Sequence, residues 1–75
     1  MHNIRITAEL TMDRQEGGYS VYCPEFDVYS QGETTEDAIQ NIKEAVTGYI
    51  KAIGIEKALK EFNPPIRETL ELSIK

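Results

Sequence analysis

The stretch GGYSVYCPEFDVYSQGETTEDA, from Gly17 to Ala38, decides the fold of this chain. Its two leading glycines accept the positive φ angles that a tight turn requires. Alternating apolar and polar residues over 19–23 then predict a strand, which Pro24 ends because proline cannot donate a ladder hydrogen bond. A shorter strand is expected over 28–31. The stretch therefore predicts two neighbouring strands that lead into a helix.

The helix start is marked by Thr34 and Asp37, which stand three residues apart as in a capping box. From Ala38 to Ile53 apolar residues recur at spacings of three and four, so we expect a helix with one buried stripe. Gly54 is a natural left-handed C-cap. Residues 55–62 fit short helical turns, a loop or a dimer contact. The residues expected to shape the turns and the helix start are Gly17, Gly18, Ser30, Gly32, Thr34 and Asp37.

The flanking segments also alternate at period two. Residues 3–12 predict a first strand with one buried face, and residues 70–74 predict a last one. A helix between strands implies a right-handed crossover into parallel pairing. The expected fold class is α+β: a three-stranded antiparallel meander, a covering helix, and a fourth strand parallel to the first. The predicted order across the sheet is third, second, first, fourth.

A chain of 75 residues has room for one domain, over residues 1–75. Domains of this size bury only about 60% of the surface that the unfolded chain exposes. Self-association is a common remedy, so we expect a homo-dimer or tetramer.

The charge balance restricts the partners. Eight basic against thirteen acidic side chains give a net charge of −5, which opposes direct nucleic-acid binding and attracts a basic macromolecule. The single cysteine cannot form an internal disulfide, which favours the cytoplasm. The first ten residues alternate and lack the apolar run of a signal peptide or membrane span, so no membrane is expected.

Catalytic patterns are absent from the sequence. His2 and Cys23 are the lone residues of their types and form no metal or nucleophile motif, so we expect no enzyme, metal or cofactor. We expect His2 to face solvent and Cys23 to serve as a small strand hydrophobe. One catalytic alternative is a magnesium site at one end of the sheet. Its carboxylates would be Glu9, Asp13, Glu25, Asp27 and Glu33.

Residues 18–50 carry a specific pattern. Its members are Tyr19, Val21, Pro24, Glu25, Phe26, Ser30, Gln31, Gly32, Glu33, Thr34, Glu36, Asp37, Ala38, Asn41, Ile42, Lys43, Glu44 and Ala45. This pattern resembles the signature of the HicB-like antitoxin family. The resemblance implies a partial RNase H-like domain that binds HicA, a small basic toxin that cleaves mRNA, and blocks it.

The chain departs from that family pattern in two places. Many members have Pro-Gly-Cys where residues 27–29 here read Asp-Val-Tyr, and the connection is one residue shorter. Many members also carry a C-terminal DNA-binding domain, whereas only a predicted strand follows Pro65 here. We therefore expect no operator binding.

The expected mechanism is occlusion of the basic RNA-binding surface of the toxin by an acidic edge. The partner-binding candidates are Pro24, Glu25, Phe26, Asp27, Gln31 and Glu33. Two alternatives stay open: an oligomeric protein-binding module whose partner is not HicA, and a residual metal-dependent nuclease.

Overall fold

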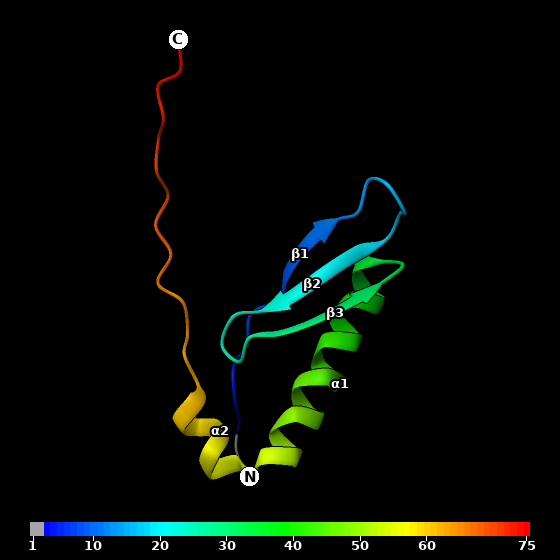
Figure 1. Ribbon diagram of the computed structural model, residues 1–75, viewed down its shortest axis with the longest axis vertical. Coiled ribbons are helices and arrows are strands. Elements are labelled where there is room, and N and C mark those ends of the chain that lie inside the picture. The colour runs from blue at the N-terminus through cyan, green and yellow to red at the C-terminus, as the bar shows by residue number, and fades with distance from the viewer. Residues whose placement is uncertain (1–2) are drawn as a thin grey trace.

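The computed structural model describes residues 3–75, so the expectation for His2 lies outside the described residues. The elements along the chain are strands β1 (Glu9–Met12), β2 (Tyr19–Cys23) and β3 (Val28–Gly32), followed by helices α1 (Thr35–Ile53) and α2 (Ile55–Glu61). Figure 1 shows the sheet as one layer lying against α1, with the chain after α2 running out beside it. Over residues 3–75, no helix has the length and apolar character needed to cross a membrane.

The three strands form the expected antiparallel meander, in the order β1-β2-β3. Leu10 pairs with Val21, and Val21 pairs with Ser30, so these residues form one row across the sheet. Gly17 and Gly18 adopt φ angles of 82° and 79° in the connection between β1 and β2. The prediction that the glycine pair turns the chain is therefore confirmed.

The start of α1 is also confirmed. The backbone N–H of Asp37 donates to Oγ1 of Thr34 at 3.1 Å, which satisfies one of the unpaired donors of the first turn. At the other end, Gly54 has a positive φ of 89° but a ψ of 148°, so the prediction of a left-handed cap is wrong. Its N–H still donates to the carbonyl of Ile50 at 2.8 Å. The extended ψ redirects the chain at once into α2.

The core lies between the sheet and the two helices. Its buried members are Val21, Cys23, Phe26, Ala38, Ile42, Val46 and Ala58. Gly32 lets β3 pack closely against α1, because a Cβ atom there would lie 2.8 Å from the Cα of Ala38. The opposite face of the sheet carries no helix (Figure 1). The fold is thus two layers, with one sheet face uncovered.

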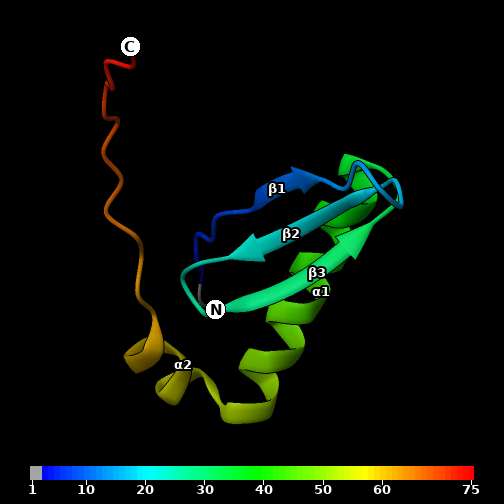
Figure 2. The ribbon, with the colours of Figure 1, turned by 45° about the horizontal axis from the view of Figure 1, so that its top comes forward.

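The two ends of the chain depart from expectation. The first strand covers Glu9–Met12 alone and not residues 3–12, because β2 ends at Cys23, opposite Ala8, and offers no ladder partner to residues 3–7. The fourth strand is not formed within the described chain, since residues 66–75 belong to no strand. They run in an extended path away from the body, as both ribbon views show (Figures 1 and 2).

Candidate functional site: an acidic cleft

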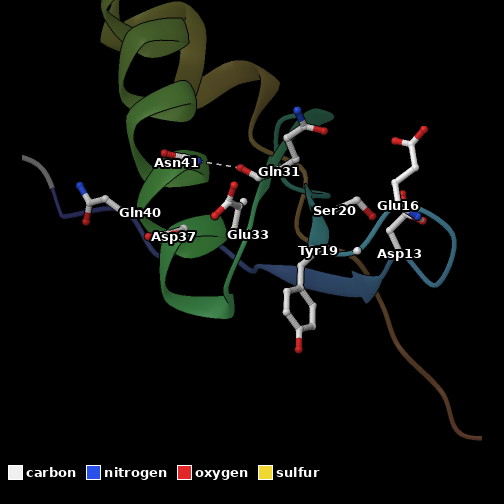
Figure 3. A pocket seen from close by; sticks show the side chains of 12 residues that line it. Asp13, Glu16, Tyr19, Ser20, Gln31, Glu33, Asp37, Gln40 and Asn41 are labelled. Carbon is white, nitrogen blue, oxygen red and sulfur yellow. Dashed lines mark hydrogen bonds between the residues drawn. The ribbon is translucent and has the colours of Figure 1, made fainter.

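An open cleft of about 730 Å³ lies where the turn between β1 and β2 approaches the first turns of α1. Figure 3 shows side chains from both walls around it. The residues that line this acidic cleft are Asp13, Glu16, Gly17, Gly18, Tyr19, Ser20, Gln31, Gly32, Glu33, Asp37, Gln40 and Asn41.

One wall is the turn of residues 13–18, which is held by local hydrogen bonds. Oδ1 of Asp13 accepts the backbone N–H groups of Gln15 and Glu16 at 3.0 and 3.1 Å. The N–H of Asp13 donates to the carbonyl of Gly18 at 3.0 Å and closes the turn. Because an aspartate at the start of a turn can bind its own backbone in this way, the loop is held in place before any partner arrives.

The other wall is the junction of β3 with α1. Nδ2 of Asn41 donates to the backbone carbonyl of Gln31 at 2.7 Å, which joins the second turn of the helix to the end of β3 (Figure 3). Thr34 caps the helix between these two residues. Glu33 and Asp37 are thereby carried on a rigid strand-to-helix junction.

The charged side chains that line the cleft are all acidic. Its lining includes four carboxylates, Asp13, Glu16, Glu33 and Asp37, and no lysine or arginine. Each of the four side chains is exposed, so they remain solvated and available. Clustered carboxylates focus a negative potential and accept hydrogen bonds from guanidinium and ammonium groups. The cleft is therefore suited to basic side chains of a macromolecular partner.

The six partner-binding candidates divide between two ends of the sheet. Gln31 and Glu33 line the acidic cleft. Residues 24–27 form the turn before β3, and the four steps from Asp27 to Gln31 place that turn roughly 13 Å from the cleft. The candidates therefore form two separate groups, one in the acidic cleft and one in the turn before β3.

Within that turn, Glu25 and Phe26 face inward, with exposed fractions of 5% and 7%. Phe26 packs edge-on against Phe62, with ring centroids 5.6 Å apart. These two residues are therefore core, and they are not available to a partner in this structure. Pro24 is half-buried and Asp27 is exposed.

Glu25 is a buried carboxylate with a complete set of partners. One oxygen accepts the N–H of Thr7 at 2.8 Å and the other accepts the Thr7 hydroxyl at 2.6 Å. Burial by itself raises the pKa of Glu25, but the hydrogen bonds from Thr7 outweigh it, so the net pKa is lowered. Glu25 thus ties the segment before β1 to the turn before β3.

Asp27 stands at the surface of the same turn, with a positive φ of 55°. Its Oδ1 accepts the hydroxyl of Tyr22 at 3.0 Å, and this hydrogen bond raises the pKa of Tyr22. The ring of Tyr22 lies 4.5 Å from that of Tyr29, centroid to centroid. The uncovered sheet face therefore carries an aromatic pair away from the acidic cleft.

The five carboxylates of the magnesium alternative do not converge. Asp13 and Glu33 line the cleft, whereas Glu25 binds Thr7 and Glu9 accepts an ion pair from Arg67 at 2.8 Å. Among residues 3–75, no three His, Cys, Asp or Glu side chains are grouped as a metal ion would require.

Cys23 is buried, and this burial raises the pKa of its thiol.

The sequence analysis did not include Asp13, Glu16, Asp37, Gln40 or Asn41 among the partner-binding candidates. A partial signal was present, because residues 37, 40 and 41 fall on one helical face at spacings of three and four. The local sequence pattern does not predict that the turn of residues 13–18 lies opposite these helix residues. Their relative position depends on how β3 leads into α1.

The comparisons with known proteins identify a family. The chain is 37% identical over 71 residues to the UPF0150 protein ssr1765 of Synechocystis sp., covering 93% of this chain and 80% of that protein. The chain therefore belongs to the UPF0150 family. No protein-family model matches the chain. No solved structure matches it either.

Proposed function

We propose that this protein is a cytoplasmic antitoxin that binds a small basic toxin of the HicA type and blocks mRNA cleavage by covering its RNA-binding surface. The observation that carries this proposal is the acidic cleft, where four carboxylates and no cationic side chain stand on two braced walls. The resemblance of residues 18–50 to the HicB-like signature supports the same assignment. We propose further that the domain has a partial RNase H-like fold.

The physical basis is competition for the same cationic groups. A protein that binds RNA presents lysine and arginine side chains to backbone phosphates. Carboxylates at Asp13, Glu16, Glu33 and Asp37 offer the same groups charge-assisted hydrogen bonds. A net charge of −5 would also speed the encounter at low salt. Inhibition in this scheme is a binding activity, and the antitoxin contributes no catalysis.

The test is co-expression with the product of an adjacent small open reading frame, followed by co-purification and growth rescue. The Glu16→Lys/Glu33→Lys double variant reverses two cleft charges, and Glu44→Lys/Glu56→Lys reverses two exposed charges outside the cleft. Both variants change the net charge equally. We expect the cleft variant to bind the toxin at least 100-fold more weakly and to lose rescue, while the control stays within about threefold.

Failure of the unmodified chain to co-purify and to rescue growth would refute the antitoxin assignment. Equal losses in both double variants would show that overall charge acts, and not the acidic cleft. Neither result depends on catalytic activity of the antitoxin.

A second candidate is a binding module whose partner is not of the HicA type. It is favoured by the aromatic pair of Tyr22 and Tyr29, since Tyr29 is 70% exposed on the uncovered sheet face. Exposed tyrosines are common anchors at protein interfaces. Loss of partner binding in Tyr29→Ser, with binding retained in Glu16→Lys/Glu33→Lys, would support this candidate over the first.

A further inference from the structure

Two segments of the described chain have the composition of strands but no ladder partner. Residues 3–8 place Ile4 and Ile6 partly against the core, yet they belong to no strand and lie outside the ladder between β1 and β2. Residues 70–74 alternate between apolar and polar side chains, and Leu70, Leu72 and Ile74 are 78%, 79% and 87% exposed. Such a row of large apolar side chains in water indicates a missing contact surface.

The edge of β1 is open on the side away from β2. The sheet order is β1-β2-β3, so β1 has one neighbour, and the N–H and C=O groups on its other side are unpaired within the sheet. Met12 on this edge is 58% exposed. Together, residues 3–12 form an edge about as long as the segment 66–75. The edge offers free backbone groups for ladder hydrogen bonds, and the segment 66–75 offers a row of apolar side chains that needs a surface to cover it.

The connection after α2 carries the segment off its own sheet. The N–H of Asn63 donates to the carbonyl of Glu25 at 3.0 Å, which anchors the end of the helix. Pro64 and Pro65 follow, and their fixed φ angles stiffen the hinge. Arg67 still reaches Glu9 of β1 at 2.8 Å, after which the chain departs (Figure 2).

The dimensions agree with an open form. The radius of gyration is 14.8 Å, against about 11 Å expected for a compact chain of this length. The extended segment accounts for the long axis in Figure 1. A short, stiff hinge beside an unpaired strand is the arrangement in which identical chains exchange elements.

We propose that residues 66–75 of one copy add as a strand to the free edge formed by residues 3–12 of a second copy, and that the exchange is reciprocal about a two-fold axis. A two-fold axis satisfies both edges and both segments at once. Charge permits it, because Arg67 and Lys75 balance Glu68 and Glu71 within the segment, so an acidic chain does not repel it. The exchanged dimer is independent of the proposed antitoxin function.

The first test is sedimentation of the full chain together with two matched variants. Leu72→Glu places a charge on the apolar face of the segment, whereas Ser73→Glu places the same charge on the opposite face. We expect a dimer for the unmodified chain and for Ser73→Glu, and at least a 100-fold rise in the dimer dissociation constant for Leu72→Glu. Circular dichroism checks that Leu72→Glu keeps its helices. A monomeric unmodified chain, or a dimer equally stable in Leu72→Glu, overturns the proposal.

The second test locates the strand. Isotope-filtered NMR on a mixture of labelled and unlabelled chains reports contacts between copies only. We expect cross-peaks from the methyl groups of Leu70, Leu72 and Ile74 to those of Ile4, Ile6 and Leu10. If these contacts appear only in a uniformly labelled sample, the segment closes on its own sheet and the exchange is refuted. Contacts to any other surface, or to a different bound protein, also refute it.

Discussion

The buried carboxylate of Glu25 gives the most informative single perturbation of this fold. Glu25→Gln keeps the shape of the side chain and removes its charge. In the native protein the carboxylate accepts the Thr7 hydroxyl at 2.6 Å and the Thr7 N–H at 2.8 Å. Thr7 and Glu25 lie eighteen positions apart, so this contact fixes the chain entering β1 against the turn that precedes β3.

The expected magnitude follows from these two bonds. A hydrogen bond to a charged group contributes about 1.5–3 kcal/mol, and a neutral one about 0.5–1.5 kcal/mol. Glutamine retains neutral bonds to Thr7, so the loss is roughly 1 kcal/mol for each bond, or about 2 kcal/mol in all. For a domain of this size, the melting temperature should fall by about 8–16 °C.

The pH dependence has a definite sign. Because the hydrogen bonds from Thr7 lower the pKa of Glu25 in the folded state, its contribution is present above the unfolded-state value of about 4.3. That contribution is lost as the pH falls through the lower folded-state pKa. The native protein should therefore lose stability below about pH 4.5, and Glu25→Gln should lose less over the same range.

The assay is urea unfolding followed by circular dichroism, at one fixed protein concentration and from pH 7 to pH 3. Glu16→Gln is the matched control, because Glu16 is exposed in the turn of residues 13–18. It should change the free energy of unfolding by less than about 0.5 kcal/mol. A Glu25→Gln variant as stable as the native protein at pH 7, or with an unchanged acid dependence, would refute the assigned role of this carboxylate.

Three further outcomes are expected. Gly32→Ala should destabilise the fold by about 1–3 kcal/mol, since its Cβ would lie 2.8 Å from the Cα of Ala38. Gly48→Ala meets nothing within 4 Å and should stabilise the helix by about 0.5–1 kcal/mol. Equal melting temperatures for the two variants would contradict both expectations. Thr34→Ala should cost about 1 kcal/mol through the lost cap, measured by urea unfolding, and an unchanged midpoint would count against the cap. The hydrogen bond to Glu61 raises the pKa of Tyr49, so Glu61→Gln should lower that pKa in a spectrophotometric titration; no change would exclude the contact.

The candidate site was predictable only in part. Gln31 and Glu33 line the acidic cleft, because they flank the strand-to-helix junction that local signals mark. Glu25 and Phe26 are buried, although an acidic and an aromatic residue beside a turn are also typical of an exposed rim. Their burial arises from contacts with Thr7 and Phe62, which are distant in the chain.

The sequence by itself determined the elements whose signals span only a few residues. Gly17 and Gly18 turn the hairpin, Thr34 starts the helix, and the apolar stripe from Ala38 selects its buried face. These features follow from backbone sterics and periodicity, which act over three or four positions.

Only the tertiary structure decided which strands find partners and which side chains meet. The period-two patterns at 3–12 and 70–74 specify extended chain, but pairing requires a neighbour at the right place, and β2 ends at Cys23. Likewise, the turn holding Asp13 faces Asp37 because β3 seats α1 against the sheet. Both results depend on packing between residues far apart in sequence, which no local pattern encodes.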